Sequence, residues 1–413
     1  MNKFILFLLL LFQMAQTMAQ NRNLEYFIQE GIQNSPLLKE YHNKGLRSKL
    51  DSLNIAAASG FQVTAVSENT YAPVVKGWGL DEVKTDKANV SALLSVSKEL
   101  TGAQNRRKHY ESIELQNQSA KNAGKISEQE LKKNITDQYI ITYSSAQQYH
   151  FNQDLLKLLD KEEAILNRLT QTGVYKQTDY LSFRVAQRQQ KIQVNSLKNQ
   201  YDYEYFTLCY LCGIQDTGIY AISDPKMEAE QFPDLASSVF TRQFVLDSLK
   251  IQNEKELISI AYKPKISAYA DAGYLSSLSY KPGRNFGANA GFTLSIPVYD
   301  GGQKGLQQKK LDLDEQDRSN YSNFFKTQYQ QQINHFWKRL SANHEMENQL
   351  SEQITFVQTL MEADHKLLES GDLLISEYVV AIGNYMNAKN ALIQNTVEKY
   401  QIINELNYWN RTK

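Results

Sequence analysis

Four short stretches of the chain alternate apolar and polar residues with a period of two. In the clearest, residues 288–296, alanine, phenylalanine, leucine and isoleucine alternate with asparagine, glycine, threonine and serine. Similar alternation occurs in residues 61–65, 89–96 and 266–274. Because successive side chains of a strand point to opposite faces of a sheet, this pattern predicts four strands with one apolar face and one polar face.

Long segments rich in glutamine and charged residues separate these strands and contain few helix breakers. All seven prolines lie at or before Pro297, and none lies between Pro73 and Pro225. Proline disrupts helix interiors, so its absence permits long helices. The first helical segment is interrupted at residues 34–36, where proline suits the first position of a new helix. We expect helices in residues 24–58, 104–171, 174–212, 235–262, 304–370 and 374–410.

The order helix, strand, strand, helix, helix occurs twice along the chain. Gly371 follows Gly173 by 198 residues, and Gly301 follows Gly102 by 199 residues. Repetition of a whole structural unit at a nearly constant offset indicates an internal duplication. We therefore divide the chain into a signal peptide, a first repeat, a linker and a second repeat, at residues 1–19, 20–212, 213–234 and 235–413.

The predicted helix lengths indicate how each repeat is arranged. In each repeat the two shorter helices together are about as long as the long helix, which at 1.5 Å per residue extends about 100 Å. Two short helices stacked end to end therefore match one long helix. The expected fold is mixed but mainly α, with long antiparallel helical hairpins whose breaks at Gly173 and Gly371 lie far from the strands.

The strands suit a lipid bilayer. Each is about ten residues long with one apolar face, which fits a tilted strand crossing a hydrocarbon layer roughly 30 Å thick. Four strands alone would leave open edges, whose backbone groups find no hydrogen-bond partners in lipid. Small closed barrels need about eight strands. Other subunits must therefore complete the sheet, and two or three copies both satisfy this requirement.

The first nineteen residues have the pattern of a secretory signal peptide. Lys3 precedes an apolar run from Phe4 to Phe12, and Thr17-Met18-Ala19 resembles a small-residue cleavage site. No later stretch approaches the twenty consecutive apolar residues of a spanning helix. We expect an exported chain without a transmembrane helix and, because no cysteine lies near the cleavage site, without an N-terminal lipid.

Charge and cysteine content exclude other classes of protein. The chain carries 45 basic and 45 acidic residues, so it lacks the positive surplus typical of nucleic-acid binding. Cys209 and Cys212 form a single Cys-x-x-Cys in a helical segment, with no second pair to complete a zinc site. We interpret them as packed small residues, although oxidation to a disulfide stays open.

At four places the sequence resembles the TolC family of outer-membrane efflux proteins, and the resemblance covers nearly the whole mature chain. LSIPVYDGGQ, from Leu294 to Gln303, resembles the family's strand-proline-turn signature. The first repeat has LSVSKELTGAQ from Leu94 to Gln104, where Lys98 replaces the usual proline. The breaks that begin TGVYKQTD and SGDLLISE resemble the glycine and acid of the family's tip motif, with Asp and Glu respectively as the acid.

The resemblance implies a homotrimer in the outer membrane. Three sets of four strands would close a twelve-stranded transmembrane barrel, continued by an α-helical tunnel across the periplasm. It further implies a passive exit duct for efflux or secretion, joined through a periplasmic adaptor protein to an inner-membrane transporter. We expect no cofactor and no metal site.

Three sets of residues are candidate sites. Asp179 and Glu377 each lie six residues after a tip glycine, so in a trimer they would place six carboxylates around the narrow end of the tunnel. Charge rings are a selectivity device in pores; the alternative is ordinary carboxylates favoured by a helix N-terminus. The two tips are expected to contact the adaptor; the alternative is that they are simple turns between helices. Their residues are Thr172, Gly173, Val174, Ser370, Gly371, Asp372 and Leu373. The junction of barrel and tunnel is expected at Pro297, Gly301, Gly302 and Gly102.

Basic residues follow both junctions, at residues 106–109 and at Lys304, Lys309 and Lys310. They either lie near lipid phosphates of the inner leaflet or form solvated helix faces.

The sequence offers no catalytic constellation. His344-Glu345 lacks the second histidine of a zinc helix, because Asn348 occupies that position. A periplasmic enzyme is therefore disfavoured. A periplasmic coiled-coil scaffold stays an alternative to the channel, but it would not explain four strands with a shared apolar face.

Overall fold

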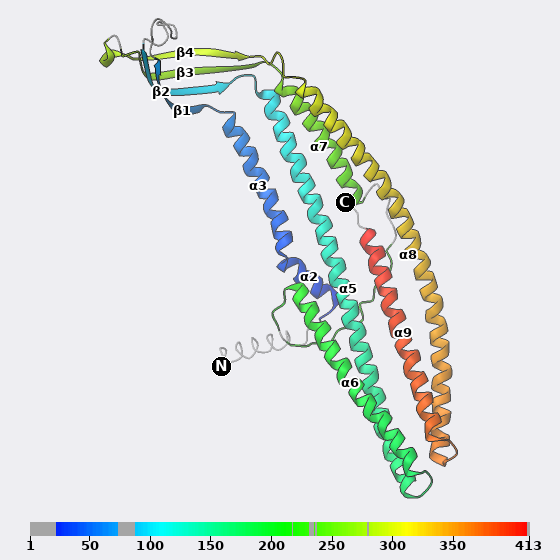
Figure 1. Ribbon diagram of the computed structural model, residues 1–413. Coiled ribbons are helices and arrows are strands. Elements are labelled where there is room, and N and C mark those ends of the chain that lie inside the picture. Colours follow the sequence, from blue (N-terminus) through cyan, green and yellow to red (C-terminus); the bar gives the residue numbers. More distant parts are fainter. Residues whose placement is uncertain are drawn as a thin grey trace, which may run out of the picture. The chain divides into compact units, whose positions relative to one another are not determined.

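The computed structural model describes residues 22–72, 87–216, 218–230, 235, 238–278 and 281–410. The predicted signal peptide lies outside the described residues, as do Pro73 and the residues that follow it up to residue 86. Figure 1 shows long helices and a group of neighbouring strands. The helices are α2 (Leu24–Asn34), α3 (Pro36–Ala58), α5 (Ala103–Gln171), α6 (Gln177–Cys212), α7 (Val239–Ala261), α8 (Gln303–Ser370) and α9 (Ile375–Trp409), and the strands are β1 (Gln62–Ala72), β2 (Lys87–Glu99), β3 (Lys265–Ser276) and β4 (Phe286–Ser295).

Helix ends follow the local chemistry of the sequence. The Asn23 side chain accepts a hydrogen bond from the Tyr26 amide at the start of α2. Ser35 is extended between α2 and α3, and Pro36 opens α3, which confirms the predicted interruption. Gly213 ends α6 with φ of 68°, a left-handed conformation that glycine adopts without penalty.

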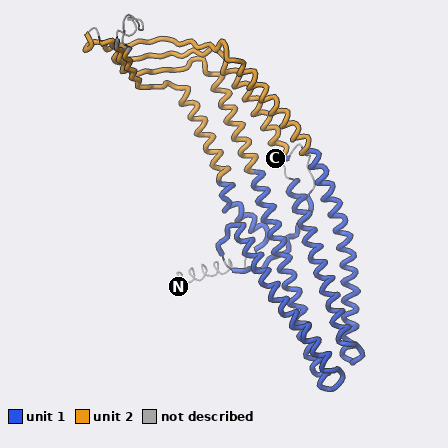
Figure 2. Tube along the Cα trace, in the orientation of Figure 1, with its two compact units in different colours: residues 1–39, 125–239, 326–413 blue, residues 40–124, 240–325 orange. Residues whose placement is uncertain are grey.

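The chain forms two compact units (Figure 2). Unit 1 contains residues 1–39, 125–239 and 326–413, and unit 2 contains residues 40–124 and 240–325. Each unit therefore takes residues from both predicted repeats. The repeat boundaries themselves stay a prediction.

Unit 2 holds an antiparallel sheet in the order β1-β2-β3-β4. Its register aligns Ala65 with Leu94, Leu94 with Ala272, and Ala272 with Ala288. Because aligned residues share a face, the apolar positions predicted for each strand lie together. The fold class predicted from the sequence, helical hairpins with four strands, is confirmed.

The apolar face of the sheet is largely exposed to solvent in the single chain. Phe61, Phe286 and Phe292 are 70%, 74% and 75% exposed, and smaller apolar residues lie between them. The opposite face carries mainly serine, threonine, asparagine and glycine. Among the described strands, β1 and β4 each pair on one side only. The sheet thus presents two free edges and one bare apolar face.

Two hydrophobic clusters lie among the described residues of unit 1. One gathers residues of α5, α6, α8 and α9 near the hairpin turns: Leu155, Leu159, Leu166, Phe183, Leu368, Ile375, Tyr378 and Ile382. The other packs α2 against α5 and α6: Phe27, Ile135, Tyr139, Tyr205, Leu208, Cys209 and Cys212. Both cysteines are free and buried, which agrees with their interpretation as packed small residues.

Buried amides fix the alignment of the helices in each hairpin of unit 1. Gln190 of α6 donates to the side-chain oxygen of Asn152 of α5 at 2.9 Å. Asn343 of α8 donates to the Asn395 backbone carbonyl at 2.9 Å, and the Asn395 amide donates back to the Asn343 carbonyl at 3.1 Å. A buried polar pair is satisfied in one register only, so it specifies that register.

Tyrosines of α5, α6 and α9 hold the segment that follows α6 by hydrogen bonds. Tyr143 and Tyr400 donate hydrogen bonds to the two carboxylate oxygens of Asp224, at 3.2 and 2.7 Å. Tyr139 donates to the Ser223 carbonyl at 2.8 Å, and Tyr201 donates to a further carbonyl of the segment. Asp224 therefore links α5 to α9.

In the part of the chain that the structure describes, no helix has the length and apolar character needed to cross a membrane.

Candidate functional site

The two hairpin tips have the same turn geometry. Gly173 and Gly371 both have φ of 82°, a conformation that disfavours any residue with a Cβ. At the first tip the Val174 amide donates to the Leu169 carbonyl at 2.9 Å, and at the second the Asp372 amide does so to the Leu367 carbonyl at 2.9 Å. Thr172 and Ser370 precede the glycines, and their hydroxyls donate hydrogen bonds to carbonyls of the last helical turn. The glycines are therefore required by the turn itself.

The structure brings the two tips into contact with each other. A Cβ added to Gly371 would lie 2.6 Å from Cγ1 of Val174, so the first tip packs directly on the second. The Tyr175 hydroxyl lies 2.9 Å from the Leu368 carbonyl and 3.0 Å from the Leu373 carbonyl. The predicted tip residues thus form one paired structure rather than two separate turns.

The two predicted gate carboxylates occupy equivalent places. Asp179 lies in the first turn of α6, and Glu377 lies in the first turn of α9. Asp179 is half-buried and Glu377 is exposed. Glu377 lines a cavity of about 410 Å³ between α8 and α9, together with Asp364. One chain supplies only these two carboxylates, so a ring of them requires further copies of the chain.

A buried carboxylate near the tips was not predicted from the sequence. Glu162 of α5 is 2% exposed, and its Oε1 lies 3.0 Å from Nδ1 of His365 on α8. The Tyr378 hydroxyl of α9 also bonds Glu162; burial, and then the Glu162 charge, raises the pKa of Tyr378. Glu162 continues the spacing of the core leucines Leu159 and Leu166 along α5, which was the one sequence signal of its burial.

The second strand-to-helix junction is a capped turn. Asp300 accepts from the Gly302 amide through Oδ1 at 2.8 Å and from the Lys304 amide through Oδ2 at 2.7 Å. These backbone bonds, with a hydrogen bond from Tyr262, hold the pKa of Asp300 below its usual value. Gly301 and Gly302 have φ of 68° and 83°, and Pro297 follows the end of β4 at Ser295.

The first junction has a different geometry. β2 continues through Lys98 to Glu99, because a lysine, unlike a proline, keeps the amide that a sheet requires. Gly102 has no positive φ, and the Thr101 hydroxyl accepts from the Ile266 amide at 3.0 Å. Of the basic residues that follow, Lys108 forms ion pairs with Glu111 and Glu256 at 2.7 and 2.6 Å.

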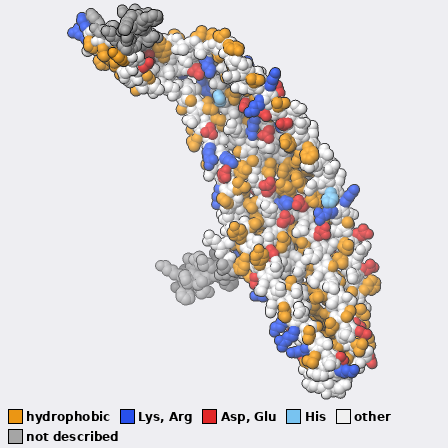
Figure 3. Space-filling view, viewed as in Figure 1, with side chains coloured by type: hydrophobic (Ala, Val, Ile, Leu, Met, Phe, Trp, Pro, Cys, Tyr) orange, Lys and Arg blue, Asp and Glu red, His pale blue; other side chains and the backbone are white. Residues whose placement is uncertain are grey.

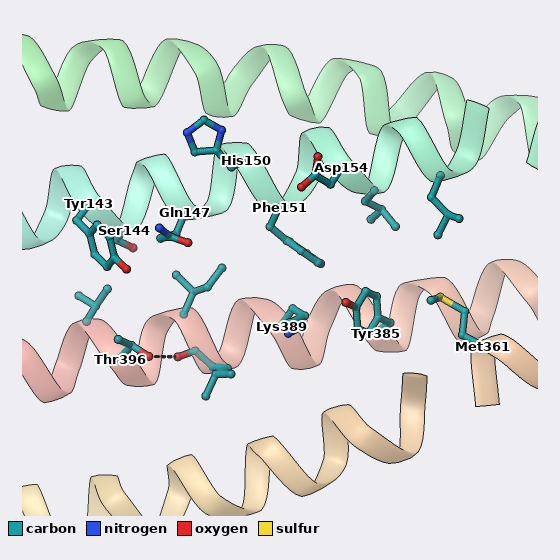
Figure 4. A pocket seen from close by; sticks show the side chains of 15 residues that line it. Tyr143, Ser144, Gln147, His150, Phe151, Asp154, Met361, Tyr385, Lys389 and Thr396 are labelled. Carbon is teal, nitrogen blue, oxygen red and sulfur yellow. Dashed lines mark hydrogen bonds between the residues drawn. The ribbon is translucent and has the colours of Figure 1, made fainter. Parts of the chain in front are cut away.

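A cavity of about 560 Å³ lies between α5 and α9 in unit 1. Figure 4 shows Phe151 of α5 and Tyr385 of α9 pointing into the space between the two helices. Their ring centroids lie 5.7 Å apart. His150, Asp154 and Lys389 also line it. No group of three metal-ligating side chains occurs in the described ranges.

The sequence matches no protein-family model, and no curated protein matches it. Solved structures do match its fold. VceC, an outer membrane protein of Vibrio cholerae, has a TM-score of 0.74 at 12% identity, over 94% of this chain and 96% of that chain.

Two further solved structures match with slightly lower TM-scores. The MtrE outer membrane channel of Neisseria gonorrhoeae has a TM-score of 0.73 at 12% identity, over 94% and 88% of the two chains. The CmeC outer membrane channel of Campylobacter jejuni has a TM-score of 0.71 at 11% identity, over 94% and 85%. The protein therefore has the fold of these outer-membrane channels, and the resemblance to the TolC family is confirmed at the level of fold.

Proposed function

We propose that the protein is the outer-membrane exit duct of an efflux or secretion system. The observation that carries this proposal is the sheet: its apolar face is exposed, and among the described strands the edge strands β1 and β4 each pair on one side only. Hydrocarbon suits such a face, but the open edges are costly there. Other copies of the chain would pair these edges and close the sheet. The duct is passive and has no catalytic role, and a partner supplies the energy.

Three copies would give twelve strands, the number that the TolC family resemblance implies. Exposed apolar residues on the helices of unit 1 support this association. On α6, Val185 and Ile192 are exposed seven residues apart, and on α8 so are Leu360 and Leu367. A seven-residue spacing is typical of helices that pack side by side. Figure 3 shows exposed hydrophobic side chains among charged ones on one face of the molecule.

At the narrow end of the tunnel, Asp179 and Glu377 of three copies would form a ring of six carboxylates. Such a ring favours cations over anions. Single-channel recording of Asp179→Asn with Glu377→Gln tests this role. Reduced cation preference is expected, and unchanged conductance and selectivity would refute the ring.

The paired tips are the proposed contact for a periplasmic adaptor, which in turn binds an inner-membrane transporter. The tip around Val174 is exposed beyond its contact with Gly371, so one side of the paired tip stays available. Crosslinking from Val174→Cys in cells should capture an adaptor protein. Capture of nothing but other copies of this chain would count against adaptor docking.

Cell fractionation separates the channel from the scaffold alternative. The channel is expected in the outer-membrane fraction, and the purified protein is expected to conduct ions in a planar bilayer. A protein found only in the soluble periplasmic fraction, without conductance, would instead be a scaffold.

A further inference from the structure

Lys98 is the one charged residue of the described strands whose register position lies on the apolar face. It aligns with Ala268 of β3, and Ala268 aligns with Phe292 of β4. The strand acids Glu68, Glu99 and Asp271 all occupy positions of the opposite face, as does Lys265. Lys98 is therefore a cation within an otherwise uncharged surface.

Apolar residues surround this cation on both sides along the strands. Phe292, which is aligned with Lys98 through Ala268, is 75% exposed, and Phe61, the residue before β1, is 70% exposed. The next row toward the helices contains Leu294 and Ile266, which are also exposed. The lysine thus lies inside the apolar band, near its helix-side end, since β2 ends one residue later at Glu99.

The ammonium of Lys98 has no acidic partner among the described residues. Its Nζ instead lies 4.6 Å from the centroid of the Phe61 ring. By contrast, Lys108 and Lys255 in the same unit form ion pairs with carboxylates. A cation facing lipid is costly unless an anion compensates it, and a long side chain can extend toward the interface to reach one.

We propose that Lys98 binds the phosphate of an anionic phospholipid in the inner leaflet, whose acyl chains cover the adjacent apolar face. The inference rests on the proposed location of the sheet in the outer membrane. A lipid is favoured over a protein partner because the face around Lys98 is continuous with the exposed apolar surface of all four strands. The acyl chains of a lipid would cover this apolar face, and its phosphate would pair with the Lys98 ammonium. The Phe61 ring holds the ammonium in place by a cation–π contact.

The replacement of proline by lysine makes this site specific to the first junction. At the equivalent place in the second repeat, Pro297 lies beyond the end of β4 and carries no charge. Each copy of the chain would therefore bind one such lipid at the first junction, and a trimer would bind three.

Native mass spectrometry of the detergent-solubilised full assembly tests the proposal. The assembly is incubated with equimolar phosphatidylglycerol and phosphatidylcholine, and the lipids that stay bound are counted. We expect the wild type to retain phosphatidylglycerol. In Lys98→Met the affinity for this lipid should fall about fivefold per site, which corresponds to the contribution of one lysine at an anionic surface. Lys98→Arg should retain the lipid.

Lys265→Met is the matched control, because it removes a lysine at the same end of the sheet but on the other face. It should leave lipid retention unchanged. Equal retention in Lys98→Met and the wild type, equal loss in both variants, or no preference in the wild type would each overturn the proposal. If Lys98→Met does not assemble, Lys98→Gln provides the same comparison. Conductance of the wild type is measured separately, so that failure of the duct is distinguished from failure of the lipid site.

Discussion

Alanine substitution of the two tip glycines provides a matched test of how the hairpin tips are joined. Gly173 and Gly371 have the same φ of 82°, so alanine strains the backbone equally at both. Their surroundings differ. A Cβ at Gly173 meets nothing within 4 Å, whereas a Cβ at Gly371 would meet Val174 at 2.6 Å.

The expected costs follow from these contacts. The left-handed backbone costs about 1–2 kcal/mol for alanine relative to glycine at either tip. At Gly371 the overlap with Val174 adds about 1–3 kcal/mol, the usual cost of forcing extra atoms into a packed contact. Val174→Ala removes the overlapping Cγ1, so Gly371→Ala should cost less in that background than in the wild type.

Amide hydrogen exchange of the full assembly measures these differences locally. The Val174 and Asp372 amides are hydrogen-bonded at the two tips, so their exchange rates report opening of each turn. A tenfold increase in exchange corresponds to about 1.4 kcal/mol. Gly371→Ala should accelerate exchange at both tips, while Gly173→Ala should act mainly at its own.

Equal effects of the two glycine substitutions would refute the reasoning. So would additive effects of Gly371→Ala and Val174→Ala, because residues in contact are expected to couple. Either result would mean that the two tips open independently.

Three further predictions concern unit 1. Asn343→Leu should lower the free energy of unfolding by about 1–3 kcal/mol because it leaves the buried Asn395 amide unpaired, and the double leucine variant should recover most of this loss in urea unfolding. Burial acts to raise the pKa of Asp224, but a hydrogen bond from Tyr400 holds this pKa below its usual value. A carboxyl whose pKa is lower in the folded state stabilises the fold above the unfolded pKa of about 3.9. This stability is lost as pH falls through the folded-state pKa. Asp224→Asn should therefore flatten the fall in thermal midpoint on acidification, and an unchanged pH profile would contradict this role. Burial raises the pKa of Cys212 to about 12, so a thiol reagent at pH 8 should label it only after denaturation, and labelling of the native assembly would disprove its burial.

The fold was largely predictable because its determinants are local. Period-two alternation located all four strands, and proline placement separated α2 from α3 at Ser35. Differences arose where a turn occupies residues of helical composition: α6 begins at Gln177 rather than Val174, because Lys176 is extended at the tip. β2 also runs beyond the alternation used to predict it, since Lys98 can pair where proline cannot.

The candidate site was less predictable because its contacts join distant parts of the sequence. The glycines and acids of the tips follow motifs that a sequence displays directly. The packing of Val174 on Gly371 and the burial of Glu162 against His365 and Tyr378 depend on two hairpins meeting. No local pattern contains that information, and a carboxylate in a charged segment is ordinarily expected on the surface.

The most direct test of the account is the oligomeric state and conductance of the protein extracted from the outer membrane. Native mass spectrometry should give a single assembly of three chains, and the same preparation should form ion-conducting pores in a planar bilayer. A monomer that forms no pores would contradict the proposal that the exposed sheet of each chain is one part of a closed membrane duct.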